Sequence, residues 1–209
     1  MVEFDNLIFH LKKRINTNLP GKDSHKKMKI SYRNEKKISF NINRAKPASV
    51  LLLLFPNNKK ICFYLTKRTE KLKYHKGQIS LPGGSNEKGE SLLETALRET
   101  EEEIGVAPQD VQILGSLTPF FTPVTGFMIH PYIGWLDKKP DTQIQDVEVE
   151  TLFTATLNEL TAEKTLQSEK WVIRDYDATV PFFNFKGIKV WGVTAAILSE
   201  LKIVIKECY

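Results

Sequence analysis

The stretch that decides the fold runs from Gly84 to Val106 and reads GSNEKGESLLETALRETEEEIGV. Its second half predicts a helix that begins at Ser91 and ends at Ile104. Ser91 followed by Glu94 three residues later is the pattern of a capping box, and the glycine after Ile104 suits the position that commonly ends a helix. At about 100° per residue, the helix has one face that should be buried, formed by Leu93, Ala96, Leu97, Thr100 and Ile104.

Three glutamates lie on a second face of the same helix, beside the buried one. Glu99, Glu102 and Glu103 are spaced i, i+3 and i+4, so their side chains converge on one patch. Like charges this close destabilise a helix unless a positive charge lies among them. Mg²⁺ and Mn²⁺ prefer oxygen ligands and commonly bridge to phosphates, so the pattern indicates a divalent-metal site. A solvated acidic face is the alternative, and the outward-facing Glu94 and Glu101 fit it.

The surroundings of these glutamates resemble the signature of a known family. The Nudix box has the pattern G-x5-E-x7-R-E-U-x-E-E-x-G-U, in which U is a bulky aliphatic residue. The sequence departs from it only at Thr100, on the buried face. Eight positions match in register: Gly84, Glu90, Arg98, Glu99, Glu102, Glu103, Gly105 and Val106. Because the chain resembles the Nudix hydrolases, the expected fold class is α/β, an α/β/α sandwich around a mixed β-sheet.

The resemblance implies how a metal would be held. Glu99, Glu102 and Glu103 would bind Mg²⁺ or Mn²⁺, with the Gly84 carbonyl as a further ligand. The metal would polarise a water molecule for attack on one phosphorus of a diphosphate link and neutralise the developing charge. No side-chain nucleophile is required.

Other residues would support this chemistry. By the same resemblance, Glu90 and Arg98 would orient the loop against the helix, which places Arg98 among the expected catalytic residues, and Gly105 would serve a structural role. The general base stays open between Glu99 and Glu148, which lies in an acidic segment outside the box.

The twenty residues up to the start of the box bear on the substrate. Residues 65–84 read LTKRTEKLKYHKGQISLPGG and resemble the signature of the coenzyme A pyrophosphatase subgroup, L-L-T-x-R-[SA]-x3-R-x3-G-x3-F-P-G-G. Matching positions are Leu65, Thr66, Arg68, Gly77, Pro82, Gly83 and Gly84. Differing positions are Tyr64, Thr69, Lys73 and Leu81. A lysine at position 73 would lose the bidentate phosphate contacts that an arginine makes. The resemblance covers about residues 46–205.

The resemblance implies hydrolysis of coenzyme A, or of its acyl or oxidised derivatives, to 3′,5′-ADP and 4′-phosphopantetheine or its derivative. Arg68, Lys73, Gly77 and Gly83 would bind this small-molecule substrate, and cations beside the metal site suit its phosphates. One alternative is a Nudix enzyme acting mainly on ADP-ribose, a dinucleotide or a nucleoside triphosphate. Another is a non-catalytic Nudix domain that senses a nucleotide.

The chain before the sheet divides into a helix and a basic segment. The apolar residues of MVEFDNLIFHLKKRIN are spaced like one face of a helix. Residues 21–37 hold seven Lys or Arg against two acids, which indicates a solvated, mobile segment or one that attracts a polyanionic substrate. We therefore expect residues 1–45 to pack on a Nudix hydrolase domain of residues 46–209.

Further elements follow from apolar runs and turn residues. Asn57 and Asn58 predict a hairpin between the first two strands. The expected strands are residues 49–55, 61–66, 111–117, 128–136, 149–154 and 187–191, and the expected last helix is residues 193–205.

Composition agrees with an ordinary globular protein. Of 209 residues, 41% are hydrophobic and 26% charged, which suits one domain. The net charge of +5 comes with no nucleic-acid recognition motif, and no apolar run approaches the roughly 20 residues of a membrane span. Cys62 and Cys208 form no redox or zinc motif, so we expect a cytoplasmic protein. A homodimer stays open, since the N-terminal helix would either cover its own domain or pair with a second subunit.

Overall fold

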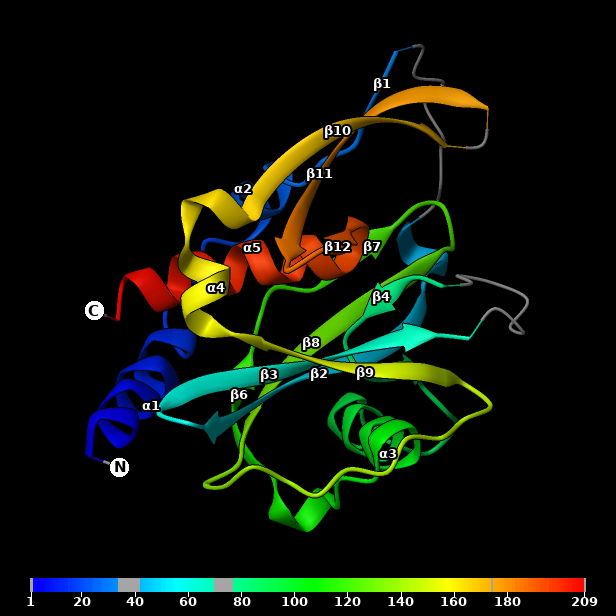
Figure 1. The fold of residues 1–209 in the computed structure, drawn as a ribbon. Coiled ribbons are helices and arrows are strands. Elements are labelled where there is room, and N and C mark those ends of the chain that lie inside the picture. The colour runs from blue at the N-terminus through cyan, green and yellow to red at the C-terminus, as the bar shows by residue number, and fades with distance from the viewer. Residues whose placement is uncertain (1, 34–41, 70–76, 174, 209) are drawn as a thin grey trace.

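The described part of the chain forms two β-sheets with helices packed against them (Figure 1). The computed structural model describes residues 2–33, 42–69, 77–173 and 175–208. The larger sheet contains β2 (Lys46–Asn57), β3 (Lys60–Arg68), β4 (Ile79–Ser80), β5 (Gly83–Ser85), β6 (Gln112–Ser116), β7 (Phe120–Thr122), β8 (Phe127–Trp135) and β9 (Val149–Thr156). The smaller sheet contains β1 (Ser31–Tyr32), β10 (Leu166–Ile173), β11 (Tyr176–Phe185) and β12 (Ile188–Trp191). The helices are α1 (Val2–Ile15), α2 (Lys22–Lys26), α3 (Leu92–Ile104), α4 (Leu157–Thr161) and α5 (Gly192–Lys206), with short 3-10 turns at Ile42–Arg44, Pro108–Asp110 and Glu163–Thr165.

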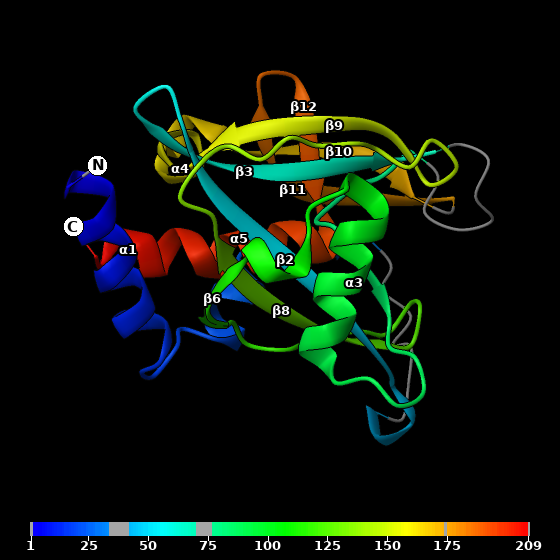
Figure 2. The same cartoon turned by 90° about the horizontal axis from the view of Figure 1, so that it is seen from below.

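The larger sheet separates two hydrophobic cores. Alternation along β2 directs Leu51 and Leu53 to the face that α3 covers, while Leu52 and Leu54 join the core shared with α1 and α5. Figure 2 shows α3 lying across the first of these faces. The sheet is mixed, because β2 runs parallel to β8 and antiparallel to β3 and β5. The expected α/β/α sandwich around a mixed sheet is therefore confirmed.

The hairpin between β2 and β3 forms one residue later than its sequence indicated. Asn57 pairs with Lys60, and the two turn residues are Asn58 and Lys59, with φ of 46° and 59°. Positive φ at both central residues is typical of the type I′ turn, whose twist matches that of the flanking strands.

Helix α3 has the expected caps. Ser91 and Glu94 form the capping box, and Gly105 ends the helix in the left-handed conformation at φ 73°. The predicted buried face was incomplete. Its members Ala96, Thr100 and Ile104 are buried and Leu93 and Leu97 partly so, but Thr95 and Glu103 are buried as well.

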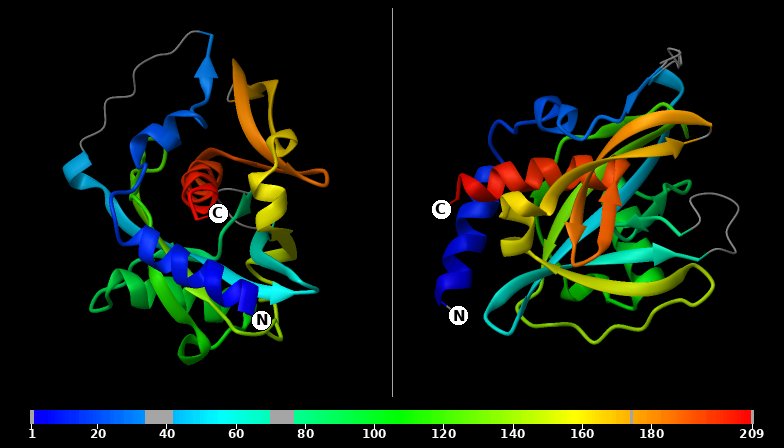
Figure 3. Two further views of the ribbon diagram at one scale, coloured as in Figure 1. Left: turned by 90° about the vertical axis from the view of Figure 1, so that its left-hand side faces the viewer. Right: turned by 45° about the horizontal axis from the view of Figure 1, so that its top comes forward.

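The smaller sheet has no counterpart in the sequence expectations except β12. Strand β10 shows why: residues 166–170 are exposed on both faces, so no alternation of apolar and polar residues marks it. Figure 3 shows α5 against this sheet, and the core around α5 includes Phe183, Phe185 and Val190. The other expected strands and the last helix are confirmed, with ends shifted by a few residues.

The N-terminal region packs on the same core. Leu7, Leu11 and Ile15 of α1 are buried in it, although the predicted domain boundary at residues 45 and 46 stays a prediction. The expectation of a solvated segment is wrong for residues 22–28, because Ser24 and His25 are buried there. The lysines and Asp23 of this segment face solvent.

Glu200 of α5 holds this region in place. It is fully buried, and its carboxylate accepts hydrogen bonds from the Gly21 amide (2.9 Å) and from the amide and hydroxyl of Thr118 (3.0 and 2.7 Å). The His25 ring lies 3.3 Å away. Burial alone would raise the pKa of Glu200, but these partners together hold it below its ordinary value. In the described part of the chain, no helix is long and apolar enough to cross a bilayer.

Candidate active site

The Nudix-box residues meet the end of β3 and the short strand β5 at one edge of the larger sheet. Two glycines of β5 allow the close approach of backbone and side chain. A Cβ on Gly84 would lie 2.4 Å from the carboxyl carbon of Glu99, and one on Gly83 would lie 2.2 Å from the carbonyl oxygen of Ser49. At Gly83 only glycine fits, because the obstacle is backbone, whereas a side chain at Gly84 would have to displace the Glu99 carboxylate.

Arg98 lies among three carboxylates. Its Nε and Nη2 each donate to Glu90 at 3.0 Å, and its Nη1 lies 2.9 Å from Glu99 and 3.1 Å from Glu102. The spacing of the helix glutamates predicts a positive charge among them, and a divalent metal alone is expected to supply it. The structure corrects this, because the Arg98 guanidinium supplies part of that charge.

Glu90 fixes the loop between β5 and α3. Besides Arg98, it accepts hydrogen bonds from the Glu87 amide (2.7 Å) and the Thr95 hydroxyl (2.8 Å). The Arg98 hydrogen bonds, followed by that of the Glu87 amide, lower the pKa of Glu90 to about 2. Glu90 therefore stays ionised and acts on the geometry of the loop rather than on a proton.

Glu103 is the most deeply buried carboxylate of the site, with 3% of its side chain exposed. One oxygen lies 3.5 Å from Arg68 Nη1 at the end of β3, and within the described residues the other oxygen has no hydrogen-bond partner. Burial raises the pKa of Glu103 to about 8; Arg68 opposes the rise, and Glu99 and Glu148 add to it. A buried carboxylate is costly in its ionised form unless a positive charge or a metal ion pairs with it, and one oxygen of Glu103 has no such partner among the described residues.

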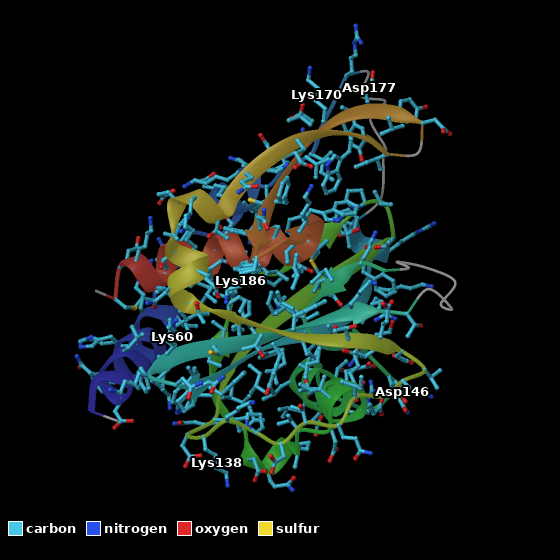
Figure 4. The ribbon with its side chains drawn as sticks, in the orientation of Figure 1. Lys60, Lys138, Asp146, Lys170, Asp177 and Lys186 are labelled. Atoms are coloured by element: carbon cyan, nitrogen blue, oxygen red, sulfur yellow. The ribbon has the colours of Figure 1, made fainter. Side chains whose placement is uncertain are left out.

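Glu148 reaches the site through the segment before β9. The amides of Gln143 and Gln145 donate to the carbonyls of Ile104 and Glu103, each at 3.0 Å. Figure 4 shows Asp146 in this segment, which passes beside α3. Gly105 permits the contact, because a Cβ there would lie 3.1 Å from the Gln143 amide nitrogen.

Thr69 fixes the same segment from β3. Its amide donates to the Glu148 carbonyl and its hydroxyl to the Val147 carbonyl, both at 3.0 Å. In the sequence, Thr69 is a departure from the subgroup signature, and nothing in the sequence predicts a role for Gln145. The Gln145 contact involves only its backbone amide and so leaves no trace in residue type, whereas the Thr69 hydroxyl contact requires a hydroxyl-bearing side chain.

The predicted metal ligands are not equally placed. Glu99 and Glu103 lie against the sheet, whereas 58% of the Glu102 side chain is exposed and its carboxylate turns to Arg98. In the observed conformation, the described residues contain no group of three or more Asp, Glu, His or Cys side chains placed closely enough to hold a metal ion. The donor set nevertheless suits Mg²⁺ or Mn²⁺, which favour carboxylate oxygens. Five carboxylates, at positions 90, 99, 102, 103 and 148, gather against the two guanidinium groups of Arg68 and Arg98.

The four predicted substrate-binding residues differ in their surroundings. Arg68 contacts Glu103, and Gly83 serves the close approach of β5 to β2. Gly77, at φ 63°, closes the loop after β3 by donating to the Arg68 carbonyl at 3.1 Å. Lys73 lies outside the described residues.

Comparison with known proteins identifies the family. Residues 45–176 match the model of the NUDIX domain. A Pectobacterium atrosepticum protein named uncharacterized Nudix hydrolase NudL is 35% identical over 147 residues, covering 68% of this chain and 74% of the relative. Nudix hydrolase 15, mitochondrial, of Arabidopsis thaliana is 37% identical over 176 residues, covering 78% of this chain and 60% of the relative. The chain belongs to the Nudix family.

A solved structure supports the fold. The Nudix hydrolase RenU of M. smegmatis aligns with a TM-score of 0.55 at 15% identity, over 78% of this chain and 87% of that one. The protein is thus a Nudix hydrolase with a diphosphate-containing small molecule as substrate, and enzymes of this family generally use divalent ions such as Mg²⁺ or Mn²⁺.

Proposed function

We propose that this Nudix hydrolase cleaves the diphosphate bond of coenzyme A, or of an acyl or oxidised derivative, to give 3′,5′-ADP and 4′-phosphopantetheine or its derivative. The observation that carries the proposal is the contact between the two sequence signatures. Arg68, from the coenzyme A pyrophosphatase signature, pairs with the box residue Glu103. Substrate selection and bond cleavage would then occur at one site.

The proposed metal ligands are Glu99, Glu102, Glu103 and the Gly84 carbonyl. Mg²⁺ or Mn²⁺ bound there would stabilise the charge that develops on the phosphoryl oxygens. The support is the surplus of carboxylates and the unpaired oxygen of Glu103. Arg98 holds Glu99 and Glu102 in place from the opposite side.

Glu148 is the general base in this proposal, ahead of Glu99. Glu99 is committed to Arg98 and packs on Gly84. Glu148 lies close enough to raise the pKa of both Glu99 and Glu103, and no ion pair of its own side chain occurs among the described residues. Its carboxylate is therefore available to take a proton from the attacking water.

Substrate phosphates would be bound by the cations and glycines before the box. Arg68 and Lys73 would supply charge for the diphosphate and 3′-phosphate groups, and Gly77 and Gly83, both partly exposed, present no side chain to the approaching substrate. The basic segment of residues 21–37 would add attraction for a polyanion at longer range. We further infer a cytoplasmic setting, since Cys62 and Cys208 are both free thiols.

Turnover of a substrate panel with product identification tests the proposal. Purified protein with Mg²⁺ or Mn²⁺ should give a higher kcat/KM on coenzyme A or its thioesters than on ADP-ribose, a dinucleotide or nucleoside triphosphates. Dephospho-coenzyme A should fall below coenzyme A, because it lacks the 3′-phosphate. A preference for ADP-ribose or a nucleoside triphosphate would establish the alternative substrate class instead.

Two variants separate recognition from catalysis. Lys73→Ala should lower kcat/KM on coenzyme A more than on dephospho-coenzyme A. Arg68→Ala should lower both, because the Arg68 side chain contacts Glu103 of the metal site. An equal loss on the two substrates in Lys73→Ala would show that Lys73 does not bind the 3′-phosphate.

A further inference from the structure

Ser49 of β2 lies beside the site, opposite Gly84, and has no role in the proposed function. It pairs with Gly84 across the antiparallel contact of β2 and β5, and with His130 across the parallel contact of β2 and β8. Side chains alternate along a strand, so Ser49 shares the face of Leu51 and Leu53. This is the face that α3 covers.

The Ser49 side chain is fully buried, and its hydroxyl has no hydrogen-bond partner in the described part of the chain. A buried hydroxyl left unpaired destabilises a fold, whereas alanine at the same position would not carry this cost. The other unpaired buried side-chain atom among the described residues is Oε2 of Glu103. Both unpaired atoms thus belong to residues that face α3 or lie on it.

The Glu99 carboxylate is the part of the site that lies near Ser49. The Cβ position of Gly84 lies 2.4 Å from an oxygen of Glu99. Directly opposed residues of an antiparallel pair have Cβ atoms about 4.5–5.5 Å apart. The Ser49 side chain therefore projects beside the Glu99 carboxylate, but no direct hydrogen bond joins the two.

We propose that Ser49 is a positioning residue of the metal site, whose hydroxyl hydrogen-bonds to the hydration shell of the cation that Glu99 holds. The inference rests on the proposed metal site. Mg²⁺ gives up its water ligands reluctantly and usually keeps several of them in proteins. Groups that hydrogen-bond to a metal's ligands typically change metal affinity by about 10- to 100-fold.

Ser49→Ala tests the proposal through two measurements: thermal stability, which should not fall, and Mn²⁺ affinity, which should fall. In the presence of a chelator, the variant should unfold at the same temperature as the wild type or higher, because it loses an unpaired hydroxyl. Its dissociation constant for Mn²⁺, measured by isothermal titration calorimetry, should rise about 10- to 100-fold. Ser49→Cys keeps the side-chain size and should give the same weakening if the alanine variant folds poorly.

Ser199→Ala is the matched control. Ser199 is also a buried serine, but it lies on α5 and its hydroxyl donates to the Ser24 carbonyl at 3.0 Å. Its loss should lower the unfolding temperature and leave the Mn²⁺ dissociation constant unchanged.

The outcomes separate this inference from the proposed function. Wild-type Mn²⁺ affinity in both Ser49 variants, together with weakened binding in Glu103→Gln, would overturn the role of Ser49 and keep the metal site. Failure of the wild type to bind Mn²⁺ at all would overturn both.

Discussion

Gly84 and Glu99 approach so closely that a methyl group on Gly84 would lie 2.4 Å from the Glu99 carboxyl carbon. The backbone of β5 thereby serves as the surface against which this carboxylate is fixed. Arg98 holds the same group from the other side, 2.9 Å from Nη1. The position of Glu99 is therefore set by two contacts.

Gly84→Ala should displace the Glu99 carboxylate and lower kcat/KM by about 100-fold or more, since a misplacement of about 1 Å in a catalytic site has effects of this size. Steady-state kinetics measures this loss of kcat/KM. Gly89→Ala is the control in the same loop: its Cβ would meet nothing within 4 Å, although φ of 97° strains it. Gly89→Ala should lose some stability and keep its activity. Equal activity in both variants would contradict the claim that the contact between Gly84 and Glu99 positions the carboxylate.

Glu103→Gln should remove a metal ligand while preserving the fold. We expect kcat to fall by orders of magnitude and Mn²⁺ affinity to weaken, because the buried carboxylate with its unpaired oxygen is replaced by a neutral amide. Glu101→Gln, on the exposed side of α3, is the matched control and should behave as wild type. Near-normal turnover by Glu103→Gln would refute the ligand assignment.

Metal affinity should depend on pH through Glu103. Its pKa of about 8 in the absence of a cation means that a proton must leave when the metal binds. Below pH 8, the Mn²⁺ dissociation constant should therefore rise as pH falls, and calorimetry in buffers of different ionisation enthalpy should detect proton release. A dissociation constant that is flat between pH 6 and 8 would exclude this coupling.

The same shift affects the stability of the metal-free protein. The folded pKa of Glu103 lies above its unfolded value of about 4.3, so the folded state binds the proton more tightly. This contribution is fully present below about pH 4.3 and is lost as pH rises through about 8. Glu103→Gln removes it, so the stability of the wild type relative to this variant, measured by urea unfolding in chelator, should fall across that range.

Glu200→Gln should destabilise the fold by about 2 kcal/mol, because hydrogen bonds to a charged group are lost in a buried site. The lowered pKa of Glu200 gives the opposite pH dependence to Glu103. Its contribution is present above the unfolded pKa of about 4.3 and is lost as pH falls through the folded pKa. Urea unfolding at pH 7 and pH 3.5 should therefore show a smaller difference between wild type and variant at the lower pH.

The sequence was most informative where the determinants are local. The caps of α3 and the register of its glutamates depend on residues a few positions apart, and both were predicted. The contact between the Glu103 backbone and the segment before β9 depends on Gln145, more than forty residues later in the chain, whose amide donates to the Glu103 carbonyl. Nothing in the residue type of Gln145 indicates such a backbone contact.

Arg98 shows a second limit. Its position on the helix was predicted. How its guanidinium divides its ion pairs among Glu90, Glu99 and Glu102 depends on side-chain rotamers and on the loop before the helix. The smaller sheet shows a third limit. Strand β10 is held by its pairing with β11, and residues exposed on both faces give no periodic signal.

The choice of general base can be tested by separating chemistry from metal binding. Glu148→Gln should lower kcat by about 100-fold or more with little change in Mn²⁺ affinity, because Glu148 is not among the proposed ligands. Glu99→Gln should weaken Mn²⁺ binding and kcat together, because Glu99 is one of them. Glu150→Gln, two residues further along in β9, is the control, since its carboxylate pairs with Lys67 at 2.6 Å instead of facing the site. If Glu148→Gln instead lost Mn²⁺ affinity as strongly as Glu99→Gln, Glu148 would be a metal ligand, and the base would have to be sought elsewhere.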